Sequence, residues 1–196
     1  MRQVPIVLAS TSPTRLALLR AAGIACTGVS PGVDESRILA ASPQALAVAR
    51  ADAKSNAVQV AGAIVIGADQ VAHIDGHAFG KPDDPEDHRA RLRQLRGRTH
   101  TLSTAVCIRL DARVHRLASH AHLRFRADLT DAEIDAYVST GEGSSCAGGY
   151  AVEGLGANLI AAIDGDYYSV LGLPLLEVID ALRALGWRPT FPPMGS

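Results

Sequence analysis

The stretch VPIVLASTSPTR (residues 4–15) indicates the fold class of this 196-residue chain. Residues 4–9 form a continuous apolar run that is too short for a helix, so they predict a buried strand. Three hydroxyl residues follow, and Pro13 is favoured at the first position of a helix, which we expect to end before Gly23. A strand, a turn and a helix in this order are the repeating unit of α/β proteins.

Further strands and helices follow along the chain. We expect an Ala-rich helix over 43–61, a strand over 63–67, a hairpin of 71–74 and 77–79 around Asp75-Gly76, a helix over 85–95, long strands over 99–110 and 114–126, a helix from Thr130 to Gly141, a strand over 159–163 and a helix from Pro174 to about Leu185. No repeat or linker divides them. The expected fold is therefore a mixed, twisted α/β sheet with flanking helices and two interleaved lobes. One domain would span residues 1–188, before a flexible tail over 189–196.

Composition excludes several classes of protein. With 19 Lys plus Arg against 20 Asp plus Glu, the formal net charge is −1, which gives no electrostatic case for binding nucleic acid or an anionic membrane. The longest apolar runs fall well short of the roughly 20 residues that a membrane span needs. Cys26, Cys107 and Cys146 are far apart and odd in number, which disfavours a disulfide framework or a cysteine zinc site. We expect a soluble cytoplasmic protein.

The hydroxyl-rich turn before the first helix predicts an anion site. Ser10, Ser12 and Thr14 lie at the end of a strand and at the start of a helix, where free backbone N–H groups and the helix dipole favour negative charge. Arg15 adds donors that suit phosphate oxygens. The alternative is that Ser12 only caps the helix while Arg15 is solvated.

Three acidic residues suggest a cation site. Asp34 and Glu35 follow Pro31-Gly32 in a predicted loop, and Asp69 comes where the apolar strand over 63–67 stops. Ligands of open α/β sheets bind at the carboxyl ends of strands, and Mg²⁺ prefers oxygen ligands. The alternative is that each acid is merely solvated or caps a turn.

Two lysines are candidates for binding a polyphosphate. Lys54 lies four residues after Arg50 on one face of the Ala-rich helix, and Lys81 follows Gly80 in a loop stiffened by Pro82. A mobile ammonium group suits phosphate. For either lysine taken alone, a surface position after a turn is the better interpretation.

Other chemistries have less support. The glycine-rich segment 148–157 does not fit the dinucleotide pattern, but it permits close approach of the backbone to a flat base. His120 and His122 share one face of a predicted strand without an evident third ligand for zinc. Ser144, Ser145 and Cys146 lack the pattern of an activated nucleophile.

Seven segments in a fixed order resemble the Maf family of nucleoside triphosphate pyrophosphatases. They are LASTSPTR (8–15), VDE (33–35), ARADAK (49–54), IGADQV (66–71), GKP (80–82), CAGGYAVEGLGA (146–157) and VLGLPL (170–175). The resemblance implies a mixed α/β fold with a nucleotide cleft between lobes, similar to inosine triphosphate pyrophosphatase. It also implies a divalent cation (Mg²⁺ or Mn²⁺), a homodimer, and hydrolysis of a nucleoside triphosphate to the monophosphate and pyrophosphate.

The resemblance also assigns roles to residues. Asp69 would be the catalytic acidic residue, acting as a base toward water or through the metal, and Glu35 would help to hold that metal. The remaining roles concern the triphosphate: Arg15, Lys54 and Lys81 would neutralise it, with Ser10 and Ser12 as added donors. This chemistry needs no covalent nucleophile.

Gln70 and Glu153 resemble the subgroup that hydrolyses 7-methylguanosine triphosphate. A carboxylate accepts two hydrogen bonds from the N1–H and N2–H edge of guanine, and its charge favours the cationic methylated base. Thr14 departs from this subgroup, which often has a larger aromatic residue there. The alternatives are the same chemistry on UTP and dTTP, or a nucleotide-binding regulator of cell division without catalysis.

Overall fold

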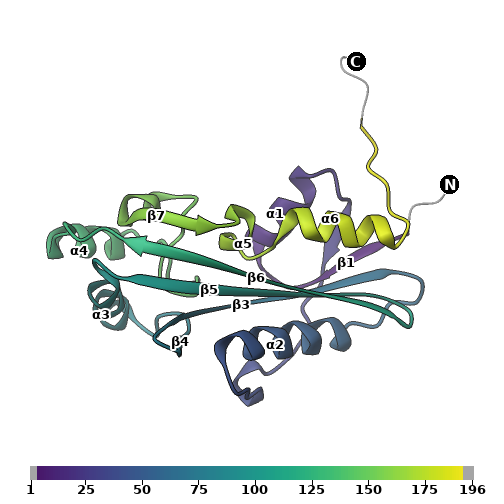
Figure 1. Ribbon diagram of the computed structural model, residues 1–196, viewed down its shortest axis with the longest axis horizontal. Helices are drawn as coiled ribbons and strands as arrows, with labels where there is room; N and C mark the ends of the chain where they lie inside the picture. Colours follow the sequence, from purple (N-terminus) through teal and green to yellow (C-terminus); the bar gives the residue numbers. More distant parts are fainter. Residues whose placement is uncertain (1–3, 192–196) are drawn as a thin grey trace.

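The computed structural model describes residues 4–191, which form one seven-stranded mixed sheet with helices on both faces (Figure 1). The strand order is β2-β1-β3-β5-β6-β7, and β4 pairs with β3. The elements are β1 (Ile6–Ala9), α1 (Pro13–Ala21), β2 (Cys26–Gly28), the 3-10 helix η1 (Glu35–Arg37), α2 (Pro43–Ala57), β3 (Ile64–Ile74), β4 (His77–Phe79), α3 (Pro85–Leu95), β5 (Thr99–Leu110), β6 (Arg113–Phe125), α4 (Asp131–Ser139), the 3-10 helix η2 (Leu155–Leu159), β7 (Ile160–Gly165), α5 (Tyr167–Val170) and α6 (Leu175–Ala184).

The two faces of the sheet carry different helices. On one face α2 packs against Val71 and Ala105, through Ala47 and Ala51. On the other face two separate apolar clusters form, one beneath α1 and α6 and one beneath α3 and α4. Figure 1 shows α2 below the sheet and α1 and α6 above it, with α3 and α4 at the far end. The sheet is therefore shared by two cores that lie at its two ends.

The α2 helix lies unusually close to β3 at Gly67. A Cβ atom added at this glycine would lie 2.3 Å from the carbonyl oxygen of Ala51 and 2.5 Å from the amide nitrogen of Ser55, both in the α2 backbone. Only a residue without a side chain permits this approach. The contact fixes α2 against the strand beside Lys54, which directly precedes Ser55.

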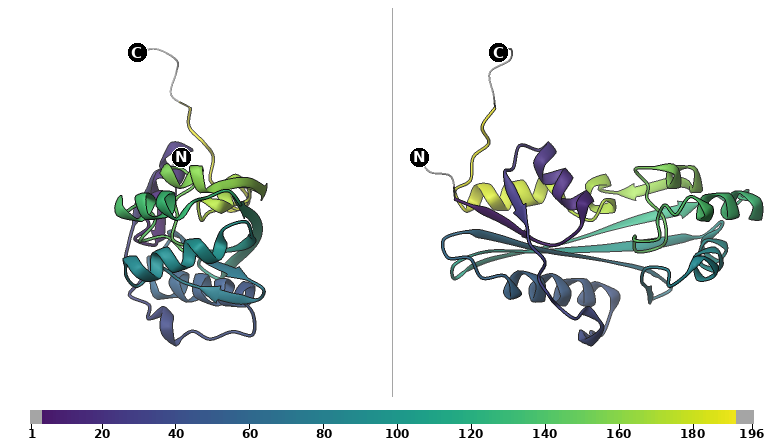
Figure 2. Two further views of the ribbon diagram at one scale, coloured as in Figure 1. Left: turned by 90° about the vertical axis from the view of Figure 1, so that its left-hand side faces the viewer. Right: turned by 180° about the vertical axis from the view of Figure 1, so that it is seen from behind.

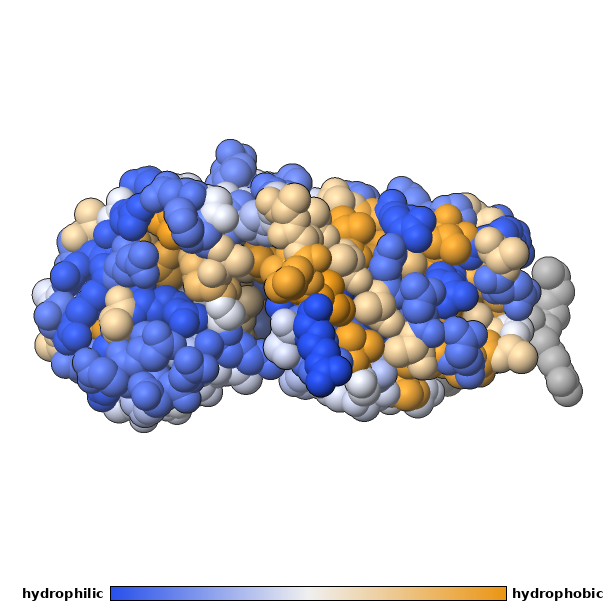
Figure 3. Space-filling model, turned by 90° about the horizontal axis from the view of Figure 1, so that it is seen from below, coloured by the Kyte–Doolittle hydropathy of each residue, from blue (hydrophilic) through white to orange (hydrophobic). Residues whose placement is uncertain are grey.

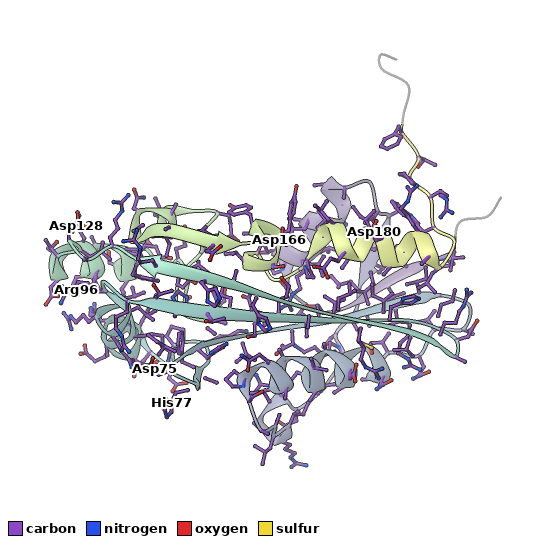
Figure 4. The ribbon with its side chains drawn as sticks, in the orientation of Figure 1. Asp75, His77, Arg96, Asp128, Asp166 and Asp180 are labelled. Atoms are coloured by element: carbon purple, nitrogen blue, oxygen red, sulfur yellow. The ribbon has the colours of Figure 1, made fainter. Side chains whose placement is uncertain are left out.

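The end of the molecule that carries α3 and α4 is strongly hydrophilic (Figure 3). Arg96 lies at this end (Figure 4) and donates hydrogen bonds of 2.9 Å to the Asp131 carboxylate and the Leu129 carbonyl. Arg89 likewise pairs with Asp135 at 3.0 Å. These partly exposed pairs join α3 to α4 and contribute little to stability individually.

The mixed α/β sheet with flanking helices is confirmed, but two element boundaries were wrong. The α2 helix ends at Ala57 and not at residue 61, because Val58 already has extended backbone angles and β-branched residues lose rotamer freedom in a helix. The predicted strands over 63–67 and 71–74 are one strand, β3, since β5 pairs with it continuously from Val65 to His73. The short β2 strand was missed, because three half-exposed residues carry no apolar pattern.

Other expectations concern what lies outside this sheet. Within residues 4–191 no helix is long and apolar enough to cross a membrane. The three cysteines are free thiols. The single domain over 1–188 stays a prediction, and residues 192–196 of the expected tail lie outside the described chain.

Substituting Gly67 tests the close contact between helix and strand. We expect Gly67→Ala to lower the free energy of unfolding by about 3 kcal/mol, because the new methyl group forces α2 away from β3. Urea denaturation followed by circular dichroism measures the change. Gly80→Ala is the control, since nothing lies within 4 Å of its added Cβ, and it should change stability by less than about 0.5 kcal/mol. Equal midpoints for the two variants would contradict the packing argument.

Candidate active site

A break in one edge of the sheet creates the candidate active site. On the edge of β3 that faces away from β5, β1 pairs with Ile64–Gly67 and β4 pairs with Ala72–Ile74. Within the described chain no strand pairs with residues 68–71 on that edge, which are Ala68, Asp69, Gln70 and Val71. Viewed from behind (Figure 2, right), β1 and α1 lie beside one part of the sheet and the green loops beside the other. Asp69, Gln70 and Val71 of this short stretch line a cleft.

The cleft has a volume of about 990 Å³ and is bordered by segments from most of the chain. It contains every site residue that the sequence predicted. Its polar lining comprises Ser10, Thr11, Ser12, Thr14, Arg15, Asp34, Glu35, Arg50, Lys54, Asp69, Gln70, Lys81, Asp83, Ser145, Cys146 and Glu153.

Lys54 connects two carboxylates at the base of the cleft. Its Nζ lies 2.6 Å from Asp69 Oδ1 and 2.8 Å from Glu35 Oε1. The Lys54 and Asp69 side chains are only 8% and 6% exposed, whereas Glu35, at the start of η1, is 42% exposed. Lys54 is therefore a buried residue of the cleft, and the alternative of a surface lysine is wrong for it.

The two carboxylates differ in their proton affinity. Burial raises the pKa of Asp69, and the charge and hydrogen bond of Lys54 offset only part of this effect. Burial also acts to raise the pKa of Glu35, but the hydrogen bond and charge of Lys54, together with the charges of Arg50 and Arg15, outweigh it, so the pKa of Glu35 is lowered. Folding thus shifts the two pKa values in opposite directions and makes Asp69 a better proton acceptor than an ordinary aspartate.

The carboxylates also suit a divalent cation. Asp69 Oδ2 is buried and has no hydrogen-bond partner among the described residues, which is costly for a charged acceptor. Its other oxygen, together with Glu35, already binds a positive charge in the form of the Lys54 ammonium. Since residues 4–191 contain no cluster of three or more metal-ligating side chains, Mg²⁺ or Mn²⁺ bound here needs water or phosphate oxygens to complete its coordination.

The turn between β1 and α1 is built from hydroxyl groups. The amide of Ser12 donates to Ser10 Oγ at 3.1 Å, and Ser12 Oγ accepts from the amide of Arg15 at 3.3 Å as the helix cap. The expected capping role of Ser12 is therefore confirmed. Arg15 is not solvated, because its Nε donates to the carbonyl of Gly172 at 2.8 Å and its Nη1 lies 3.5 Å from Ser10 Oγ. The guanidinium thus ties the segment before α6 to the hydroxyl turn.

Gln70 points to the face of β3 opposite Asp69, because neighbouring side chains of a strand alternate. Its Nε2 donates to the carbonyls of Ser169 and Val170 at 2.8 and 3.1 Å, and to Thr104 Oγ1 at 3.0 Å. The protein's own acceptors thereby fix the orientation of the amide. Its Oε1 is the atom left to accept a hydrogen bond from a ligand.

Glu153 lies on the far wall of the cleft, in the loop before η2. It is exposed, and its Oε1 accepts a hydrogen bond of 3.5 Å from Thr14 Oγ1. The loop is held by Glu142, whose carboxylate accepts from the amides of Leu155 and Gly156 at 3.1 and 2.8 Å. Tyr137 adds a hydrogen bond to Glu142 and one from the amide of residue 151, both 3.1 Å. Sequence reasoning missed Glu142 and Tyr137, since their partners are apparent only after folding.

Asp69 and Lys81 lie in different parts of the cleft, one within β3 and the other in the loop after β4. Asp69 was expected at the end of a strand, which is wrong, because it lies inside the eleven-residue β3. The strand that ends there is β1, whose last residue, Ala9, pairs with Gly67, so the carboxyl end of a core strand still borders the site. Lys81 is exposed at the rim of the cleft, after β4.

Comparison with known proteins identifies the class of this fold and site. A family model described as Maf-like protein matches residues 5–185, so the chain belongs to the Maf family.

Particular relatives have more specific names. The dTTP/UTP pyrophosphatase of Thermus thermophilus is 45% identical over 185 residues, covering 94% of this chain and 97% of the relative. The nucleoside triphosphate pyrophosphatase of Streptomyces avermitilis is 44% identical over 197 residues, covering 94% and 95%. Among solved structures, the Staphylococcus aureus Ham1 protein matches at 12% identity with a TM-score of 0.42, over 63% of this chain and 72% of that one.

Removing Lys54 tests the electrostatics of the carboxylate pair. We expect Lys54→Met to raise the pKa of Asp69 further, because the substitution removes the ammonium that stabilises the ionised carboxylate. Titration of the carboxyl carbon by NMR measures the pKa in the wild type and the variant. Lys81→Met, which alters an exposed lysine, is the control and should leave the Asp69 titration unchanged. A lowered pKa of Asp69 in Lys54→Met would contradict the interpretation.

Proposed function

We propose that the protein hydrolyses a nucleoside triphosphate to the nucleoside monophosphate and pyrophosphate. The observation that carries this proposal is the arrangement of Lys54 between Glu35 and Asp69, at the bare edge of β3 and beside the hydroxyl turn. Membership of the Maf family and the names of the relatives support it.

The proposed mechanism divides the work among residues of the cleft. Ser10, Ser12 and the amino end of α1 bind phosphate oxygens, and Arg15, Lys54 and Lys81 neutralise the triphosphate. Asp69 and Glu35 are the residues that would hold Mg²⁺ or Mn²⁺, which when bound supplies further neutralisation of phosphate charge and acidifies water.

Asp69 accepts the proton in the proposed reaction, since burial raises its pKa. The oxygen of the water forms a bond to the α-phosphorus, while the bond from that phosphorus to the bridging oxygen breaks. The electron pair leaves with pyrophosphate, and no covalent intermediate with the protein is needed.

Asp69→Asn tests this assignment directly. We expect a loss of roughly 10³-fold in kcat, because the amide cannot accept the proton and is a poor ligand for a divalent cation. Pyrophosphate release from a panel of nucleoside triphosphates, with Mg²⁺ or Mn²⁺ and with a chelator, measures it. Hydrolysis in ¹⁸O-labelled water should place the label in the monophosphate.

The control for this variant is Asp164→Asn, which alters an exposed carboxylate on β7 outside the cleft and should retain wild-type turnover. Wild-type activity in Asp69→Asn would refute the catalytic role. If the wild-type protein binds nucleotides tightly but turns over none of the panel, the non-catalytic regulator replaces the enzyme as the preferred function.

Two classes of nucleobase have separate support. The name of the Thermus thermophilus relative favours UTP and dTTP. Gln70 and Glu153 favour 7-methylguanosine triphosphate, because both residues resemble that subgroup and the two oxygens of the Glu153 carboxylate suit a base edge with two neighbouring N–H donors. Uracil and thymine have a single N–H between two carbonyl oxygens. The charge of Glu153 adds a preference for a cationic base.

Glu153→Gln separates these two classes. If the carboxylate reads the base, we expect the ratio of kcat/KM for 7-methylguanosine triphosphate over UTP to fall about tenfold, because glutamine accepts only one of the two hydrogen bonds and carries no charge. The same panel assay measures the ratio. An unchanged ratio removes the argument from Glu153, and a wild-type preference for UTP or dTTP selects the pyrimidine class.

Homodimer formation and a cytoplasmic location stay predictions.

A further inference from the structure

We propose that Arg50 is a further phosphate-binding residue of this site, which contacts the phosphate group held next to Asp69. The inference deepens the proposed function and rests on it. Sequence reasoning used Arg50 only to describe the face of the helix on which Lys54 lies.

The position of Arg50 places its guanidinium over the two carboxylates. It lies one turn before Lys54 on α2, and both side chains line the cleft. Its Nη2 donates to the backbone carbonyl of Glu35 at 3.3 Å, which orients the group. Its Nη1 is 3.9 Å from both Glu35 Oε2 and Asp69 Oδ2, beyond hydrogen-bond distance.

The donors of Arg50 are poorly used by the protein itself. Its Nε is buried and has no hydrogen-bond partner among the described residues. A buried donor of a charged group that lacks an acceptor destabilises the folded state. By contrast, Arg116 binds the neighbouring Asp52 of the same helix with its Nε, at 3.0 and 2.9 Å from the two carboxylate oxygens. An exposed arginine of β6 is thus closely paired with α2, whereas the arginine of α2 that lines the cleft is incompletely bonded.

Arg50 Nε and Asp69 Oδ2 are both buried, both lack a hydrogen-bond partner among the described residues, and are opposite in hydrogen-bonding role. One is a donor that needs an acceptor, and the other is an acceptor that needs a donor or a cation. A cation-bound phosphate satisfies both at once, because its oxygens accept from the guanidinium while its positive ion faces the carboxylate. The planar fork of arginine suits this geometry better than the ammonium of lysine. A ligand of this chemistry is what the substrate and the pyrophosphate product share.

Binding of inorganic pyrophosphate with magnesium, measured by calorimetry, tests the inference without any turnover. We expect Arg50→Gln to weaken binding about 10- to 100-fold, because it removes the charge and the donor fork. Arg50→Lys should recover only part of the loss, since it restores the charge without the Nε donor. The matched control is Arg116→Gln, which removes an arginine paired with the same helix outside the cleft.

A kinetic measurement complements the binding assay. Arg50→Ala should lose activity and regain part of it when guanidinium ion is added, which a merely structural role of Arg50 would not produce. Wild-type affinity for pyrophosphate in both Arg50→Gln and Arg50→Lys would overturn the inference, as would a wild-type protein that does not bind pyrophosphate. If Arg50-dependent binding is found but no nucleotide is hydrolysed, the phosphate contact stands and the proposed function fails.

Discussion

The close contact of α2 with β3 at Gly67 is the constraint on which the site depends. Because the glycine has no side chain, the backbone of the helix approaches the strand more closely than ordinary packing allows. Lys54 directly precedes the contact residue Ser55 on the helix, and Asp69 lies two residues after Gly67 on the strand. Lys54 and Asp69 therefore meet in a buried ion pair. The charged residues of α2 are therefore held directly against β3 by packing of the two elements.

The break in the sheet edge determines which groups of β3 a ligand can reach. The β1 strand stops at the level of Gly67, and the antiparallel β4 ends at the level of Ala72, so no strand pairs with the edge of β3 between these two levels in the described chain. Alternation along the strand sends Asp69 to the face of α2 and Gln70 to the face of α5. A ligand at this edge meets charged groups on one side and an oriented amide on the other, which matches a phosphate chain joined to a base.

Charge burial gives the site its chemical character. Taking Lys54 and Asp69 out of water is unfavourable, and the pair persists because Glu35 and the short distances offset that cost. Among residues 4–191, one oxygen of Asp69 and one nitrogen of Arg50 nevertheless have no hydrogen-bond partner. Folding thus holds a charged donor and a charged acceptor in fixed positions where they can interact with a ligand. Such preorganised groups stabilise charge that develops during a reaction.

The sequence by itself determined the features that depend on neighbours in the chain. Helix starts at Pro13, Pro43 and Pro85 and the Asp75-Gly76 hairpin follow from local sterics and capping, and the structure contains them all. The ordered segments that resemble the Maf family also indicated the residues that line the cleft.

Only the tertiary structure decided the features that depend on distant partners. Continuous pairing with β5 made one strand of two predicted ones and placed Asp69 in its middle. The local sequence does not predict the contacts of Glu142 with the loop of Glu153. It also does not predict the incomplete hydrogen bonding of Arg50. The physical reason is that hydrogen-bond satisfaction and burial are properties of groups brought together by folding, whereas turns and caps are properties of the adjacent backbone.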